Sequence, residues 1–225
     1  MPKSALIYAW AVIATGVAVL ACAVVGWQSS DRGAFIVGLG LVAMAATFKM
    51  KLPKLTGTLS PAFVFVLVSV ATETWSETVI IAALSAAVQC LWRPKTRPTA
   101  LQLAFNMAAL AIAGGVAHGM TRLLIVRSNP DLLLVVLGAA GVALLVTNIL
   151  LLSTILCLVR EAPFMTIWRS VQMWTVPYYL AGGVLANIWA RAQLSPATGG
   201  VVLALASVYV LSICYRELSF VIGPG

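Results

Sequence analysis

Long apolar stretches, separated only by short charged or turn-forming segments, run through the whole chain. Of its 225 residues, 62% are hydrophobic and 9% are charged, whereas soluble domains are about 45–50% apolar and about 25% charged. A helix needs about 20 mostly apolar residues to cross the hydrocarbon core of a bilayer. The sequence therefore excludes a water-soluble domain and predicts a single all-α, polytopic transmembrane bundle over residues 1–225.

The charged and turn-forming segments define about eight candidate spans. We place these spans near residues 5–27, 33–48, 61–72, 78–92, 99–121, 132–159, 176–190 and 200–215. Residues 160–174 are predicted to form an interfacial amphipathic helix, because large apolar side chains recur there at helical spacing. The third and fourth stretches are short, so the alternative is six spans plus a re-entrant hairpin over residues 61–92.

The distribution of Lys and Arg predicts the orientation of the bundle. With a cytoplasmic N-terminus and eight crossings, the outer loops hold only Arg32, Arg122, Arg127 and Arg191, and the other ten of the 14 cations are cytoplasmic. We therefore expect both termini in the cytoplasm of a bacterial inner membrane. The net charge of +8 then reports orientation and does not indicate a nucleic-acid partner.

Two basic clusters stand out on the predicted cytoplasmic face. They consist of Lys49, Lys51 and Lys54, and of Arg93, Lys95 and Arg97. A Lys or Arg near an anionic leaflet contributes about 1 kcal/mol of attraction. We expect these clusters to contact anionic lipids or a protein partner.

Neutral amides are the main polar groups inside the predicted spans. Asn106 and Asn148 lie at depths that could form one layer, and Gln102 lies one turn before Asn106. An unpaired amide facing lipid would cost several kcal/mol, so these side chains should point into the bundle. They could line a pocket for a small ligand, or they could form interhelical hydrogen bonds, which are worth about 0.6 kcal/mol each on average.

Two carboxylates, Glu73 and Glu77, lie one helical turn apart at the predicted outer tip between the third and fourth stretches. Such a pair could bind a cation or a cationic ligand. A solvated hairpin tip is the more common role of such a pair. The single histidine, His118, falls near the same outer side and is interpreted as an interfacial polar residue.

The sequence contains no motif for catalysis or cofactor binding. The chain has no Walker loop, HExxH, GxSxG or acidic cluster within a span. We therefore predict no catalytic residues, no metal site and no cofactor, and a protein that is not an enzyme.

The order of several segments resembles a known family. The segment KLPKLTGTLSPAFVFVL at 51–67 is followed by LAFN at 103–106, VTN at 146–148 and PYYLAG at 177–182. This order is similar to the N-terminal membrane domain of bacterial HD-GYP and GGDEF signalling proteins. The resemblance implies a sensor or transducer domain in which Asn106 and Asn148 occupy recurrent positions. We expect no cytoplasmic output domain, since few residues follow Arg216.

Three functions remain open from the sequence. The first is a sensor-like or accessory subunit that acts through a partner protein or as a homo-oligomer. The second is a small-molecule binding or transport subunit, since the overall shape is also similar to the membrane substrate-binding component of energy-coupling-factor transporters. The third is a structural subunit of a larger membrane complex.

Overall fold

The computed structural model describes most of the chain up to residue 161 and parts of the rest. The described residues are 1–29, 31–48, 50–51, 58–94, 97–125, 133–161, 163–165, 168, 179–180, 182–190 and 209. The predicted span 200–215, apart from Tyr209, and most of the predicted interfacial helix 160–174 therefore lie outside the described residues.

Within that part of the chain, six helices have defined ends, and residues 182–190 are also helical. The helices are α1 (Lys3–Val25), α2 (Arg32–Thr47), α3 (Ala62–Thr72), α4 (Trp75–Leu91), α5 (Ala100–Ile125) and α6 (Leu133–Arg160). A minimal antiparallel hairpin of β1 (Met50–Lys51) and β2 (Thr58–Leu59) joins α2 to α3. The helices coincide with the first six predicted stretches, and the largest difference is at the end of α5.

Three of these helices, α1, α5 and α6, are long and apolar enough to cross a membrane. The other three, α2, α3 and α4, are shorter apolar helices. The prediction of a helical membrane protein is confirmed at this level.

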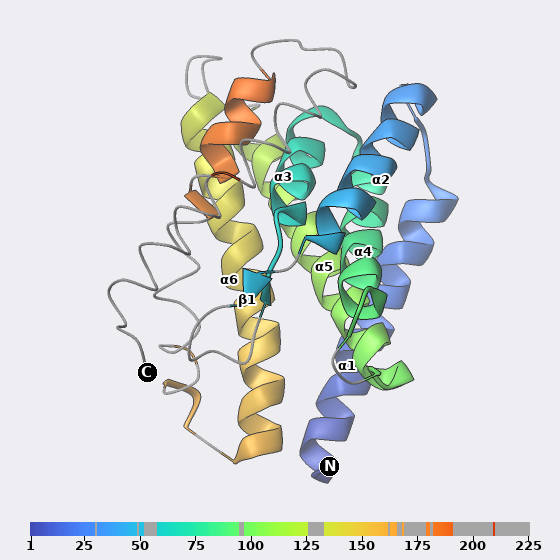
Figure 1. Ribbon diagram of the computed structural model, residues 1–225, viewed down its shortest axis with the longest axis vertical. Coiled ribbons are helices and arrows are strands. Elements are labelled where there is room, and N and C mark those ends of the chain that lie inside the picture. The colour runs from blue at the N-terminus through green and yellow to red at the C-terminus, as the bar shows by residue number, and fades with distance from the viewer. Residues whose placement is uncertain are drawn as a thin grey trace.

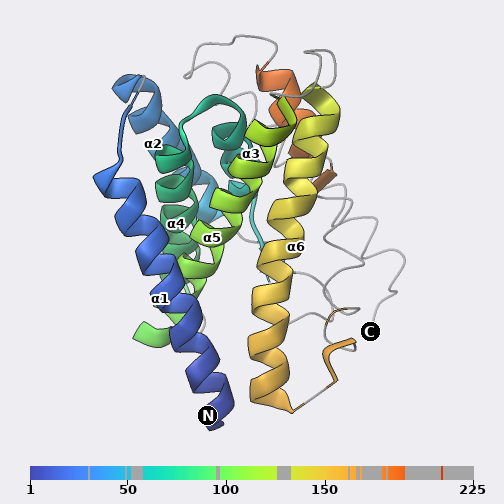
Figure 2. The same ribbon diagram turned by 180° about the vertical axis from the view of Figure 1, so that it is seen from behind.

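The helices run roughly along the long axis of the bundle (Figures 1 and 2). The end at which α1 begins is called the lower end here, as drawn in Figure 1, and the opposite end is called the upper end. The α1–α2 and α3–α4 connections both lie at the upper end. Helix α5 rises from the lower half to the upper end, and α6 returns to the lower end.

Helix α3 is too short to cross a bilayer. Its 11 residues span about 16 Å at about 1.5 Å per residue, against about 30 Å of hydrocarbon. Accordingly, α2 descends from the upper end to β1, which lies near mid-height, and α3 rises again (Figure 1). The pair α2–α3 thus occupies only the upper half of the bundle (Figure 1) and is called the half-depth pair here. The sequence alternative was a re-entrant hairpin over residues 61–92. Strand β1, which lies near mid-height, contains Lys51.

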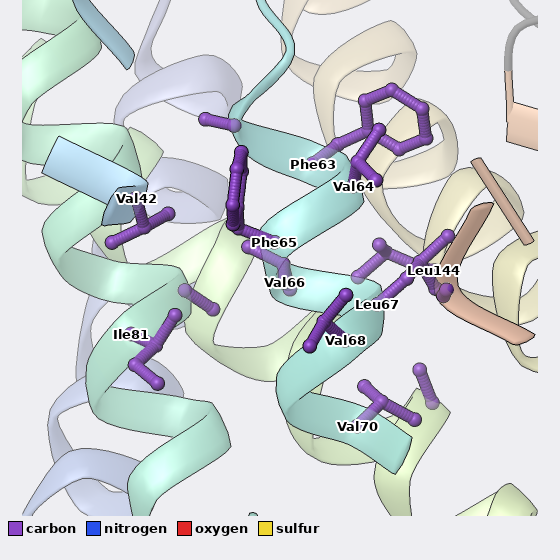
Figure 3. Close-up of a cluster of buried hydrophobic side chains, with 14 of the residues drawn as sticks. Val42, Phe63, Val64, Phe65, Val66, Leu67, Val68, Val70, Ile81 and Leu144 are labelled. Atoms are coloured by element: carbon purple, nitrogen blue, oxygen red, sulfur yellow. The ribbon is translucent and has the colours of Figure 1, made fainter. Parts of the chain in front are cut away.

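Side chains on every side of α3 are buried, which makes this helix the centre of the bundle. All residues from Ala62 to Val70 are buried, and their side chains reach Val42 of α2, Ile81 of α4 and Leu144 of α6 (Figure 3). A helix that is apolar all round is stable only where neighbours cover it. The hydrophobic sequence of α3 therefore reflects burial in protein.

Small residues bring α1 and α4 close to α5, because small side chains let helix backbones approach closely. A Cβ at Gly16 of α1 would collide with Ala108 of α5, and a Cβ at Gly114 of α5 would lie 3.0 Å from the Cβ of Ala82 in α4. In contrast, Ile7 and Val25 of α1 are 70% and 89% exposed. These exposed apolar side chains form the face of α1 suited to lipid.

Candidate ligand-binding site

A capping box starts α4 at the upper end of the bundle. The Thr74 hydroxyl accepts a hydrogen bond from the Glu77 backbone N–H (3.3 Å), and the Glu77 Oε2 accepts one from the Thr74 backbone N–H (3.0 Å). The Thr74 hydroxyl also donates to Oε2 (2.8 Å). The sequence signal for this arrangement is Thr-x-x-Glu before an apolar run. It places the Glu77 carboxylate against the start of the helix, where the helix dipole favours negative charge.

Glu77 is fully buried, with 0% of its surface exposed. Its Oε1 atom has no hydrogen-bond partner among the described residues, and the same holds for the buried Oγ of Ser29. The Ser29 hydroxyl and the Glu73 carboxyl are its neighbouring side chains. The interpretation of this segment as a solvated hairpin tip is therefore wrong for Glu77, because the α1–α2 connection covers it.

Glu73 lies in the turn between α3 and α4 and is partly buried. Burial, together with the negative charge of Glu77, raises the pKa of its carboxyl from 4.5 to about 7. The Thr72 hydroxyl approaches Oε1 at 3.4 Å. Glu73 is thus the ionisable group at this end whose protonation changes near neutral pH.

His118 fixes the backbone of this turn from α5. Its Nε2 lies 3.1 Å from the Glu73 carbonyl oxygen, and a carbonyl only accepts, so Nε2 carries the proton of this hydrogen bond. The side chain is 4% exposed. His118 therefore holds the α3–α4 turn to α5, a role that its position in the sequence did not indicate.

A cavity of about 200 Å³ opens beside Glu73. Its polar lining residues are Asp31, Ser69, Thr72 and Glu73. Its remaining lining residues are Ala34, Val37, Gly38, Leu41, Phe65, Val68, Ile81 and Trp189. Two carboxylates thus lie on the wall of a mostly apolar cavity between α2, α3 and the helical residues 182–190.

Asp31 reaches this cavity because it caps α2. Its Oδ1 accepts hydrogen bonds from the backbone N–H groups of Gly33 (2.8 Å) and Ala34 (3.1 Å). An Asp immediately before an apolar helix is a sequence signal for an N-cap. That signal predicts the helix start, but only the fold brings Asp31 to the same cavity as Glu73.

The predicted amides lie elsewhere, each with its own partner. The Asn106 amide donates to Cys90 Sγ of α4 (3.2 Å), and a side-chain hydrogen bond joins Asn148 to Tyr179. Gln102 forms a capping box with Thr99 at the start of α5, where its Oε1 accepts from the Thr99 N–H (3.0 Å). None of the three lines the cavity beside Glu73.

The basic residues are described only in part. Arg93 and Arg97 are exposed, and the Arg93 guanidinium lies 5.7 Å from the centre of the Trp92 ring. Lys49, Lys54 and Lys95 lie outside the described residues. The exposed arginines remain suited to a lipid headgroup or a partner.

Within the described residues, no group of three or more His, Cys, Asp or Glu side chains is arranged to hold a metal ion.

Comparisons with known proteins do not assign the chain to a family. No protein-family model, curated protein or solved structure matches the chain.

Proposed function

We propose that the chain is a non-enzymatic, multi-pass protein of the bacterial inner membrane that binds a small molecule at its upper end and acts through a partner protein. The observation that carries this proposal is the cavity between α2 and α3, which has Asp31 and Glu73 on its wall. Pockets for small ligands are mostly apolar with a few well-placed polar groups. This cavity has that composition.

The orientation derived from the Lys and Arg distribution makes the upper end the outer side of the membrane. In this proposal the chain makes six crossings and has cytoplasmic termini, because α2 and α3 turn back without crossing, and the half-depth pair α2–α3 carries the ligand site. Exposed Arg93 and Arg97 are available on the opposite side for a partner or anionic lipid. Such a layout suits a sensor-type subunit, as the resemblance to bacterial signalling membrane domains implies.

Filling the cavity tests the proposal. Gly38 lines it, and a Cβ at this position would meet only Ile81 Cδ1, at 3.6 Å. Gly38→Leu should therefore fold and occupy the cavity. Gly40→Leu is the matched control, because nothing lies within 4 Å of a Cβ at that position. Both variants gain the same helix propensity.

The measurement is the melting temperature of the purified protein in mild detergent, with and without a panel of small amines and neutral aromatic alcohols. At least one compound should raise the melting temperature of the wild type and of Gly38→Ala, and should have no effect on Gly38→Leu. A panel that stabilises none of these proteins, or that stabilises Gly38→Leu equally, would exclude a ligand site in this cavity.

A transport subunit is the second candidate, and the half-depth position of β1 and β2 favours it. Because α2 and α3 turn back near mid-height, these two helices do not line the path from the cavity to the lower end. Proteoliposomes separate the two functions: a sensor binds the ligand without moving it, whereas a transport subunit exchanges labelled ligand across the bilayer.

A further inference from the structure

We propose that the cavity exchanges a proton for an organic cation: the Glu73 carboxyl holds a proton in the free protein and pairs with an ammonium group when the ligand is bound. This inference rests on the proposed function, because it assigns the ligand class and the pH regulation of the same cavity.

The cavity wall favours a ligand that combines a positive charge with an apolar body. Glu73 and Asp31 both line it, and the charged neighbours that act on Glu73 are the carboxylates Glu77 and Asp31. Phe65 and Trp189 are also on the wall, and aromatic faces attract cations within about 6 Å of the ring centre. An aryl-alkyl ammonium matches both the charge and the apolar surface.

The fully buried Glu77 explains why Glu73 carries a proton before the ligand binds. Its Oε2 is held by Thr74, but its Oε1 has no donor in the part of the chain that the structure describes. Two adjacent carboxylates do not both ionise readily in a buried site. A protonated Glu73 removes this repulsion and donates to the Glu77 carboxylate, and the two carboxyls are in fact neighbours.

Ser29 supplies the second state of the switch. Its hydroxyl lies next to Glu77, and among the described residues its buried Oγ has no hydrogen-bond partner either. When the ionised Glu73 pairs with the ligand, it no longer donates to Glu77, and the Ser29 hydroxyl donates to Glu77 in its place. Glu73 in the free protein and Ser29 in the ligand-bound protein thus each provide one donor to the buried Oε1 of Glu77. A lone carboxylate on the surface would need neither donor, because water would bind it.

The titratable and charged groups around Glu73 come from three further elements. Asp31 caps α2, Glu77 is in the first turn of α4, and His118 of α5 contacts the Glu73 carbonyl, with Arg122 one turn beyond it. The pKa of Glu73 lies at about 7 among them. The exchange should therefore operate within the physiological pH range.

The exchange balances without electron transfer. A protonated Glu73 and a free R–NH₃⁺ give a Glu73 carboxylate paired with R–NH₃⁺, plus one proton released to water. The ammonium keeps its own proton, because alkylammonium groups have pKa values of about 10. Below pH 7 the apparent Kd should therefore rise about tenfold per pH unit, by competition between the proton and the cation.

The test uses the full chain in detergent and phenethylammonium as the probe. Isothermal calorimetry in two buffers of different ionisation enthalpy at pH 6 counts the protons released, and the expected result is close to one per ligand. Glu73→Gln keeps a hydrogen-bond donor next to Glu77 but has no titratable proton. It should release none, lose the pH dependence and bind at least tenfold more weakly. Glu161→Gln, an exposed glutamate at the end of α6, is the matched control and should behave as wild type.

A neutral probe of the same shape, 2-phenylethanol, separates this inference from the proposed function. Should it bind as tightly as phenethylammonium, release no proton and remain sensitive to Gly38→Leu, the cavity would be a ligand site but the proton–cation exchange would be refuted. Failure of both probes to bind would count against the proposed function itself.

Discussion

Polar side chains in this protein fall into two groups with different surroundings. Between the helices, Asn106 and Asn148 each have a partner on another element. At the upper end, Glu77 is fully buried and one of its oxygens has no partner within the described ranges, and Glu73 lies beside a cavity. Polar groups that are paired inside a bundle hold helices together, whereas a buried charge with an open hydrogen-bonding position indicates a site. The comparison therefore favours the upper end over the amides as the place where function resides.

The packed interior should be the more fragile region. Gly16→Val places side-chain atoms where Ala108 of α5 already stands, so α1 and α5 must separate. Overpacking of this kind costs about 1–3 kcal/mol, and we expect the upper part of that range because the collision includes backbone. Urea or SDS titration would measure it.

Gly40→Val is the control for this variant, because nothing lies within 4 Å of a Cβ at position 40. Equal stability of the two variants would show that the α1–α5 contact is not close.

The two capping boxes offer a direct contrast. Thr74→Ala removes the hydroxyl that donates to Oε2 of the fully buried Glu77 and accepts from the Glu77 backbone N–H, although the backbone N–H of residue 74 remains as a donor. Thr99→Ala removes the same type of cap at an exposed helix start. N-cap losses cost about 0.5–2 kcal/mol, so we expect about 2 kcal/mol for Thr74 and about 0.5 kcal/mol for Thr99. If thermal unfolding showed similar losses of stability for the two variants, the burial of Glu77 would not increase the cost of losing its cap.

Stability should fall as pH rises, because of Glu73. Its pKa is raised from 4.5 to about 7 in the folded protein, so the folded state binds the proton more tightly than the unfolded state. The stabilising contribution is fully present below pH 4.5 and is lost as pH rises to 7. Its size is smaller than the Thr74 effect because Glu73 is only partly buried.

Melting temperatures between pH 4.5 and 8 would measure this contribution, and Glu73→Gln should flatten the profile over that interval. A profile that Glu73→Gln leaves unchanged would assign the pH dependence to another group.

The smallest effects should come from the amides. Asn106→Leu and Asn148→Leu each remove one interhelical hydrogen bond, worth about 0.6 kcal/mol on average. Neither variant should change phenethylammonium binding, because neither side chain lines the cavity. If either variant abolished binding, the amides would belong to the ligand site and the comparison would be reversed.

Periodicity and charge in the sequence predicted the first six helices closely, because apolar length and its interruptions are local properties. The caps at Asp31, Thr74 and Thr99 are also readable from local spacing. The half-depth path of α2 and α3 could not be read from the sequence, since a short apolar stretch is compatible both with a span that thins the bilayer and with a buried helix. The burial of α3 on every side depends on contacts with helices that are distant in the sequence, and hydropathy does not report such contacts.

The sequence by itself determined that this chain is a helical membrane protein, and it singled out Glu73 and Glu77 as an unusual pair. Only the tertiary structure decided that Glu77 is buried, that Asp31 and Glu73 share one cavity, and that Asn106 and Asn148 are separately paired. The physical reason is that hydropathy depends on neighbouring residues, whereas desolvation and charge coupling depend on which distant segments meet at the end of the bundle.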